Sequence, residues 1–270
     1  IQLNPVKSTH EGNWLHFTTQ YGGKRFTDNF AEFIKKYGEH YMTDMYAAGF
    51  YPYPSEEAKW GYWSKHALMN RFDPPALPLY TELYDLVKNK EYFVLTTNVD
   101  HQFYKAGFDE KRIFATQGDY GKIQCQKACH SKTYDAKDLF RKMDKARRDC
   151  LIPSELVPKC PVCGGNMAMN LRCDNYFVED EAWHEAADRY AGFLEQHKDK
   201  KVVLLELGVG FNTPIIIRFP FEKMVRENSS YSLIRLNMDE AVVPESFGER
   251  AIGIDGDMAK AITDIRGLVL

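Results

Sequence analysis

The amino-acid sequence predicts an α/β fold, a parallel sheet with helices on both faces, with one small inserted module. Two observations lead to this prediction. Short apolar runs alternate with segments of helical periodicity along most of the chain, as in successive βαβ units. The segment 125–173 interrupts that alternation with cysteines and a densely charged stretch. A chain of 270 residues is long enough for one large domain with such an insertion.

The first third of the chain is expected to be helical. A helix is predicted to begin at Thr27 as its N-cap, because aromatic and apolar residues follow at helical spacing. A second helix is predicted after Ser55, which follows the Tyr-Pro-Tyr-Pro sequence of residues 51–54. The leucines between Leu79 and Val87 form the apolar side of a third helix.

Strands and helices alternate in the rest of the chain outside the module. The predicted strands are Tyr92–Leu95, Arg112–Ala115 (closed by Gln117-Gly118-Asp119), Lys201–Leu207 and Tyr231–Leu236. The predicted helices are one ending near Gly107, Glu181–His197, one starting at Thr213-Pro214, and Asp257–Ile265.

Polar or glycine clusters follow three of these strands. Asn98 and Asp100 follow the first, Gly208 and Gly210 another, and Asn237 ends a third. Ligands of open parallel sheets bind outside the carboxyl ends of the strands. The sequence therefore predicts a ligand site at this edge of the sheet.

Composition narrows the class of protein. With 44% hydrophobic and 27% charged residues and a net charge of −3, the chain is expected to be globular. It has no basic tract with interleaved aromatic residues, so nucleic-acid binding is not expected. Its longest apolar runs are too short for a membrane span, and residues 1–10 lack a secretory signal, which favours a cytoplasmic protein.

Four of the six cysteines form two close pairs. Cys125 and Cys129 are spaced C-x3-C, and Cys160 and Cys163 are spaced C-x2-C before two glycines. This pattern predicts a closed, structural zinc site in the inserted module. Two disulfides or four unrelated thiols are the alternatives, and His130 is a further candidate ligand.

The order of these motifs resembles the sirtuin family. The motifs are Thr-Thr-Asn-Val-Asp at 96–100, Ala-Gly at 106–107, Gln-Gly at 117–118, the cysteine pairs, Gly-Val-Gly at 208–210 and Asn237. Residues 21–26, 116–121, 178–180 and 206–214 look like the macrodomain-linked, class M branch of bacterial sirtuins. The resemblance implies a Rossmann-like NAD-binding domain at 1–124 and 174–270, with the zinc module at 125–173. It also implies NAD-dependent transfer of ADP-ribose to a protein, for which a lipoylated glycine-cleavage H-like carrier is proposed.

The resemblance also implies roles for individual residues. Asn98 and Gln117 would be catalytic and would hold the nicotinamide ribose, with Asp100 on the carboxamide. The remaining cofactor contacts would be Arg25 and Phe26 in a mobile loop, Gly208, Val209 and Gly210 near the adenosine, Asn237 on its ribose, and Asp257. Ordinary structural roles are the alternatives, namely helix capping for Asn98 and Asp257, a first-turn acid on the helix macrodipole for Asp100, a strand end for Asn237, and a plain turn for the glycines.

Two departures from the family pattern bear on activity. Gln117 stands where a deacylating sirtuin has histidine, and an amide can hold a ribose hydroxyl but cannot act as a general base. The substitution therefore disfavours deacylation more than ADP-ribosyl transfer. The Gly-rich loop that holds the NAD pyrophosphate in sirtuins is not recognisable in residues 1–17, and its absence would weaken NAD binding. A deacylase, an NAD hydrolase and a non-catalytic NAD- or ADP-ribose-binding module are the alternative functions.

Overall fold

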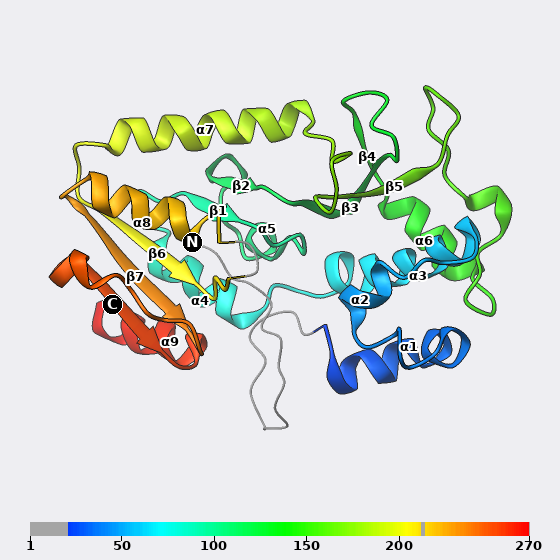
Figure 1. Ribbon diagram of the computed structural model, residues 1–270, viewed down its shortest axis with the longest axis horizontal. Coiled ribbons are helices and arrows are strands. Elements are labelled where there is room, and N and C mark those ends of the chain that lie inside the picture. The colour runs from blue at the N-terminus through cyan, green and yellow to red at the C-terminus, as the bar shows by residue number, and fades with distance from the viewer. Residues whose placement is uncertain (1–20, 212–213, 270) are drawn as a thin grey trace. The chain divides into compact units, whose positions relative to one another are not determined.

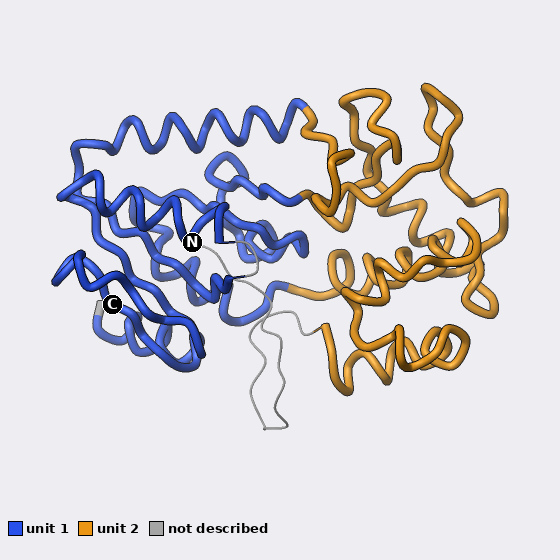
Figure 2. The backbone as a smooth tube through the Cα atoms, viewed as in Figure 1, with its two compact units in different colours: residues 1–5, 76–117, 181–270 blue, residues 6–75, 118–180 orange. Residues whose placement is uncertain are grey.

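The computed structural model describes residues 21–211 and 214–269, which form two compact units (Figure 2). The first unit contains residues 76–117 and the described part of 181–270. The second contains residues 21–75 and 118–180. The segment 125–173 lies inside the second unit, which therefore extends beyond the predicted zinc module.

The first unit contains the predicted parallel strands (Figure 1). One parallel pair is β1 (Val94–Thr96) with β2 (Ile113–Ala115), and a three-stranded sheet has the order β6 (Val202–Leu207), β7 (Tyr231–Asn237), β8 (Ala251–Asp255). Its helices are α4 (Pro78–Val87), α5 (Gln102–Lys105), α7 (Glu181–His197), α8 (Arg218–Glu227) and α9 (Met258–Val269), with the short helices η2 (Glu110–Arg112) and η4 (Glu245–Arg250). Strand β8 was not predicted from the sequence.

Helices cover the strands of the first unit and close a common core. Helix α7 packs on β2, α8 packs on β7, and α9 packs on α4 and β7. A single apolar cluster contains side chains of both sets of strands, including Leu95, Phe114, Leu204 and Leu233. Shared burial of these side chains holds the two sets of strands together, because removing apolar surface from water is the main driving force of folding.

The second unit combines helices with an antiparallel sheet. Its helices are α1 (Gly23–Tyr37), α2 (Met45–Gly49), α3 (Glu56–Ala67), α6 (Lys137–Ala146), the π-helical turn η1 (Leu68–Phe72) and η3 (Ser154–Leu156). Its strands have the order β4 (Thr133–Asp135), β3 (Gly118–Cys125), β5 (Met167–Leu171). Ser55 caps α3 as predicted, since its hydroxyl accepts a hydrogen bond from the Ala58 N–H (3.2 Å).

Three predicted boundaries were wrong. Helix α1 begins at Gly23, and the Thr27 hydroxyl donates to Lys24 O within it (3.2 Å) instead of capping it. Helix α8 begins at Arg218, because Pro214 starts a turn in which its carbonyl accepts from the Phe219 N–H. Gly118 opens a new strand, β3, and its φ of 98° and the Asn170 carbonyl 1.9 Å from a built Cβ leave room only for glycine.

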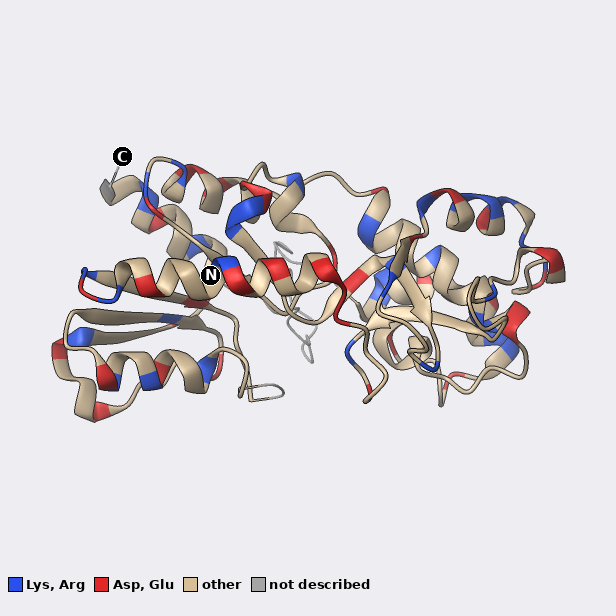
Figure 3. Ribbon diagram, turned by 90° about the horizontal axis from the view of Figure 1, so that it is seen from above, with Lys and Arg blue, Asp and Glu red and all other residues tan. Residues whose placement is uncertain are grey.

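Charged side chains of both signs are interspersed along the helices of each unit (Figure 3). This distribution agrees with the small net charge of −3. Among the described residues, every helix is too short or too polar to span a lipid bilayer.

The core of the second unit contains a histidine within an aromatic cluster. His66 is fully buried, and its ring centroid lies 4.6 Å from that of Tyr120 and 5.1 Å from that of Trp63. Its Nδ1 lies 3.3 Å from the Tyr62 hydroxyl, and its Nε2 has no hydrogen-bond partner. Burial, with a smaller effect of the positive charge of Arg25, lowers the pKa of His66 to about 3.

This depressed pKa predicts a loss of stability in mild acid. The unfolded chain binds a proton at His66 near pH ~6.5, whereas the folded chain does so only near pH 3. The stabilisation is therefore complete above pH ~6.5 and declines as the pH falls toward 3, by about 2 kcal/mol between pH 7 and pH 5. Urea unfolding at both pH values measures it. His66→Gln should remove this part of the pH dependence, and the exposed His184→Gln should retain it. An unchanged pH dependence in His66→Gln would contradict the assignment.

Candidate functional site

The carboxyl ends of β1 and β2 lie side by side in the first unit. Their pairing aligns Thr96 with Ala115, and the Thr116 N–H continues it by donating to Thr96 O (2.9 Å). The Thr116 hydroxyl donates to the same carbonyl (3.3 Å). Asn98 and Gln117 follow these two strand ends, so the structure places both residues beyond the carboxyl ends of paired strands.

Asn98 is held at two points and has one open acceptor. Its backbone N–H donates to the Thr96 hydroxyl (3.0 Å), and its side-chain Nδ2 donates to the Tyr80 hydroxyl (3.1 Å). Its Oδ1 is buried and has no hydrogen-bond partner. A buried acceptor without a partner costs about 1–3 kcal/mol, and a ligand hydroxyl or water at this position would remove that cost. The capping alternative does not describe the Asn98 side chain, which bonds to α4 instead.

Asp100 lies in the same loop and is nearly buried. Its carboxylate accepts a hydrogen bond from the Gln102 N–H (3.1 Å) at the start of α5. Next to it, His101 adopts a left-handed backbone conformation (φ 66°), which is uncommon outside glycine. Its ring stacks on Tyr104 at 3.9 Å. Asp100 therefore lies just before α5 and not in its first turn, so the structural alternative was wrong about its position. Its contact with a carboxamide stays a prediction from the family resemblance.

The loops after β6 and β7 meet at the carboxyl ends of these strands in the three-stranded sheet. Gly208 has a positive φ of 65°, and its N–H donates to Leu236 O (2.8 Å). The Asn237 side chain donates to Val209 O (3.1 Å). A Cβ at Gly210 would lie 3.1 Å from a carboxylate oxygen of Glu240. The structure thus brings Asn237 and the Gly208–Gly210 turn together.

Two buried arginines fix these loops, and the sequence analysis did not identify either of them. Arg218 donates to the carbonyls of Val209 (3.1 Å), Glu240 (3.1 Å) and Val242 (3.3 Å). Burial lowers its pKa, and the charge of Arg235 lowers it further. Because one guanidinium can donate up to five hydrogen bonds in a fixed plane, Arg218 can fix the loops after β6 and β7 relative to each other. Arginines are common in sequences, so only the fold could show this role.

Arg235 joins the strands beneath these loops. Its guanidinium forms a bidentate ion pair with Glu206 (2.6 and 3.0 Å) and also donates to Glu222 (2.9 Å) and to Val242 O (2.6 Å). Arg235 and Glu206 are both fully buried. Burial raises the pKa of Glu206, and the hydrogen bonds and charge of Arg235 oppose that rise. A cavity of about 370 Å³ opens above this network, between Phe211, Phe219 and Val242.

Arg25, Phe26 and Asp257 have structural contacts. Arg25 and Phe26 lie in helix α1 of the second unit and not in the predicted loop, because aromatic residues at helical spacing are buried there. Phe26 stacks on Phe30 at 5.4 Å, and Arg25 donates to Met69 O (3.3 Å). Asp257 caps α9, since its carboxylate accepts from the Ala259 (2.7 Å) and Lys260 (3.0 Å) N–H groups. The predicted lack of a Gly-rich loop at 1–17 concerns residues outside those described.

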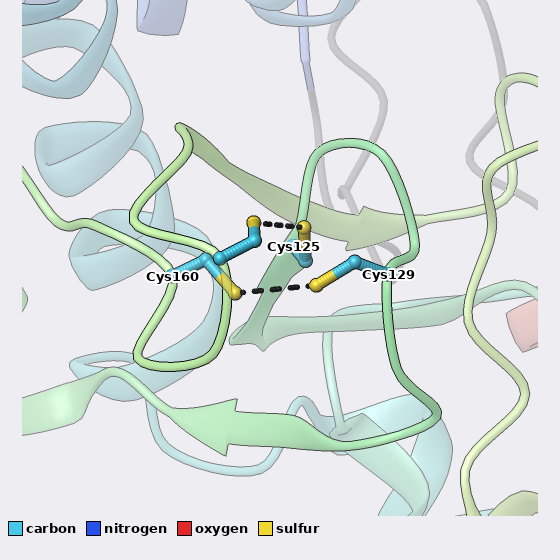
Figure 4. A group of neighbouring side chains, drawn as sticks. Cys125, Cys129 and Cys160 are labelled. Carbon is cyan, nitrogen blue, oxygen red and sulfur yellow. Dashed lines mark hydrogen bonds between the residues drawn. The ribbon is translucent and has the colours of Figure 1, made fainter.

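The four paired cysteines converge in the second unit (Figure 4). Their sulfur atoms all lie within 4.8 Å of one another, with Cys125 and Cys163 at 3.7 Å and Cys129 and Cys160 at 3.6 Å. These separations exclude disulfides, whose sulfurs lie ~2.05 Å apart. They match the edge of a tetrahedron of thiolates around zinc, about 3.8 Å for Zn–S bonds of ~2.3 Å. The cluster can therefore hold one zinc ion through four protein ligands.

Backbone hydrogen bonds fix the turn that carries Cys160 and favour the thiolate form of Cys125. The Gly164 N–H donates to Cys160 O and the Cys160 N–H to Gly165 O (both 2.8 Å), which closes a tight turn. Backbone N–H groups, chiefly that of Cys129, lower the pKa of Cys125 to about 6 and so favour its thiolate. His130 is the weaker candidate ligand. Its Nε2 lies 3.4 Å from the sulfur of Cys160, so it contacts one of the four cysteines and does not point to the space between them.

Removing one of these thiols should release the metal. Cys160→Ser is expected to reduce bound zinc from about one ion per chain to close to none and to lower the melting temperature, since a structural zinc contributes directly to folding. Metal analysis of the purified protein and thermal unfolding measure the two effects. Cys173→Ser is the matched control, because Cys173 is exposed and lies outside the cluster. Full zinc content in Cys160→Ser would contradict a four-thiolate site.

Comparison with known proteins identifies the family. A protein ADP-ribosyltransferase of Staphylococcus aureus (strain Mu50) is 40% identical over 244 residues, which cover 90% of this chain and 76% of the relative. The chain belongs to the family of protein ADP-ribosyltransferases. A probable bifunctional ADP-ribose hydrolase/ADP-ribosyltransferase of Fusarium oxysporum f. sp. cubense is 31% identical over 235 residues, covering 82% of this chain and 39% of that protein.

Solved structures show that this transferase has the fold of the sirtuins. A Sir2 homologue in complex with NAD has a TM-score of 0.52 at 15% identity and covers 78% of this chain and 72% of its own. A second Sir2 structure, concerned with mechanism and regulation, has a TM-score of 0.50 at 16% identity and covers 89% and 88%. At these identities the likeness shows the fold alone. No protein-family model matches the chain.

Proposed function

We propose that this chain transfers ADP-ribose from NAD to a protein acceptor at the edge formed by the ends of β1 and β2. The observation that carries the proposal is the buried Oδ1 of Asn98, which has no hydrogen-bond partner beside the strand end that leads to Gln117. A ribose hydroxyl is a donor of the right kind for this acceptor. Membership of the transferase family supports the same reaction.

In the proposed reaction the bond between nicotinamide and the ribose C1′ breaks, and nicotinamide leaves with the bonding electrons. A nucleophile of the acceptor protein forms the new bond to C1′ and gives its proton to solvent. Asn98 orients a hydroxyl of the nicotinamide ribose, and Gln117 holds a ribose hydroxyl through its amide. Neither amide titrates, so both act by positioning and hydrogen bonding.

The loops after β6 and β7 are proposed to bind the adenosine half of NAD. Gly208, Val209 and Gly210 allow close approach of the backbone, and Asn237 contacts the adenine ribose. The hydrogen bonds of Arg218 support this assignment, because they fix the shape of both loops before a ligand arrives. For Arg25, Phe26, Asp100 and Asp257, the family resemblance is the only support for a cofactor role.

The acceptor is proposed to be a lipoylated carrier protein related to glycine-cleavage H protein, on the basis of the resemblance to class M sirtuins. A reducing compartment, and so the cytoplasm, is proposed from the six free cysteines, four of which form the metal cluster. This site is less suited to deacylation, because Gln117 stands where a deacylating sirtuin has its histidine base. Losing a general base typically lowers the rate by a factor of ~10²–10⁴.

Release of nicotinamide from NAD tests the reaction. Asn98→Ala is expected to slow release by about 100-fold, because poor positioning of a reacting group can cost that much. Asn89→Ala is the matched control, since Asn89 is an exposed asparagine beyond the end of α4. Radiolabelled NAD follows transfer of ADP-ribose to lipoylated and unlipoylated carrier protein in the same experiment.

Each other outcome identifies a different function. Binding of NAD without release of nicotinamide would indicate a binding module. Free ADP-ribose without a labelled acceptor would indicate an NAD hydrolase. Deacylation that depends on Asn98 would indicate a deacylase and would overturn the interpretation of Gln117. Release at an equal rate by wild type and Asn98→Ala would remove Asn98 from the mechanism.

A further inference from the structure

The start of helix α4 is tied both to helix α5 and to the loop that carries Asn98. The Leu77 N–H, just before α4, donates to the side-chain carbonyl of Gln102 (2.8 Å). One turn further, the Tyr80 hydroxyl accepts the hydrogen bond from Asn98 Nδ2 (3.1 Å). The Tyr80 ring is fully buried and meets the edge of Phe103, in α5, at 5.0 Å and 83°. Tyr80 is therefore a rigid point from which the Asn98 side chain is held.

A carboxamide has a donor end and an acceptor end, and its environment decides which end faces a ligand. At Asn98 the donor end is bonded to Tyr80, and the acceptor end, Oδ1, is the one without a partner. If the carboxamide turned by half a rotation, Nδ2 would occupy the place of Oδ1. It would then oppose the hydroxyl hydrogen that the proposed reaction brings there.

We infer that Tyr80 is a positioning residue that holds the Asn98 carboxamide with Oδ1 toward the nicotinamide ribose. The inference rests on the proposed function, because it assigns the unpartnered Oδ1 of Asn98 to that substrate. Tyr80 itself does not touch the reacting atoms. It acts only through Asn98, and its effect must disappear when the Asn98 carboxamide is removed.

The chemistry of the Tyr80 hydroxyl suits this role. Burial raises the pKa of Tyr80 well above its usual range, and the charge of the nearby Asp100 adds to the rise. The phenol therefore stays neutral over the working range of pH. The hydrogen bond that the Tyr80 hydroxyl accepts from Asn98 Nδ2 therefore does not change through titration of Tyr80.

Tyr80→Phe tests the inference because it keeps the buried ring and removes one oxygen atom. The expected result is a decrease of about 10-fold in kcat for nicotinamide release, the scale of one well-placed hydrogen bond, with less than ~3-fold change in KM for NAD. Tyr92→Phe is the matched control. It also removes a tyrosine hydroxyl that accepts one hydrogen bond, but the donor is the backbone N–H of Asp109 (3.1 Å) and not Asn98.

A double-mutant cycle separates positioning from general support of the fold. In the Asn98→Ala background, Tyr80→Phe should cause no further decrease in kcat, since the group it positions is absent. A purely structural role for the hydroxyl would give the same decrease in both backgrounds. Equal kcat values for wild type and Tyr80→Phe, or additive effects in the cycle, would overturn the inference while leaving the proposed function intact.

The hydrogen bond between Asn98 and Tyr80 can also be tested by a measurement that does not depend on catalysis. The side-chain NH₂ signal of Asn98 in the NMR spectrum can be identified by its loss in Asn98→Asp. Tyr80→Phe should shift this signal and Tyr92→Phe should leave it in place. A wild-type chain that releases no nicotinamide would refute the proposed function. An Asn98 signal unchanged by Tyr80→Phe would refute the positioning by Tyr80.

Discussion

The parallel pairing of β1 with β2 is the constraint on which the site depends. It aligns two strand ends so that the loop carrying Asn98 and the segment carrying Gln117 leave the sheet side by side. The hydrogen bond from Thr116 to Thr96 O extends the pairing one residue beyond the strands. Asn98 and Gln117, about twenty positions apart in the chain, thereby follow neighbouring strand ends, and the Oδ1 of Asn98 has no hydrogen-bond partner there.

Elsewhere in the first unit, buried arginines restrict the conformations of the loops after β6 and β7. Arg218 and Arg235 are surrounded by carbonyl and carboxylate oxygens and have little exposure. Buried charges are stable only when paired and hydrogen-bonded, so these contacts permit few alternative loop arrangements. The cysteine cluster restricts the second unit in a similar way. Its two cysteine pairs can bind one zinc ion only when all four sulfur atoms converge.

Much of this fold could be predicted from local patterns. The strands β1, β2, β6 and β7 and helix α7 follow apolar runs and helical spacing closely, and the cysteine spacing indicated the metal cluster. Strand β8 was missed because Gly253 interrupts its apolar pattern, and that glycine is required by the Ala241 carbonyl, 2.0 Å from a built Cβ. Tyr80 and Arg218 were missed because their roles arise from partners distant in sequence. The position of Asn98 after a strand end could be predicted, because its motif directly follows an apolar run.

A crystal structure with bound ADP-ribose would test the central claim most directly. The account predicts that the ribose that carries nicotinamide in NAD lies over the ends of β1 and β2, with one of its hydroxyl groups ~2.7–3.0 Å from Asn98 Oδ1. It also predicts that Nδ2 of Asn98 remains bonded to Tyr80. A ribose bound elsewhere, with Asn98 Oδ1 still lacking a partner, would contradict the account.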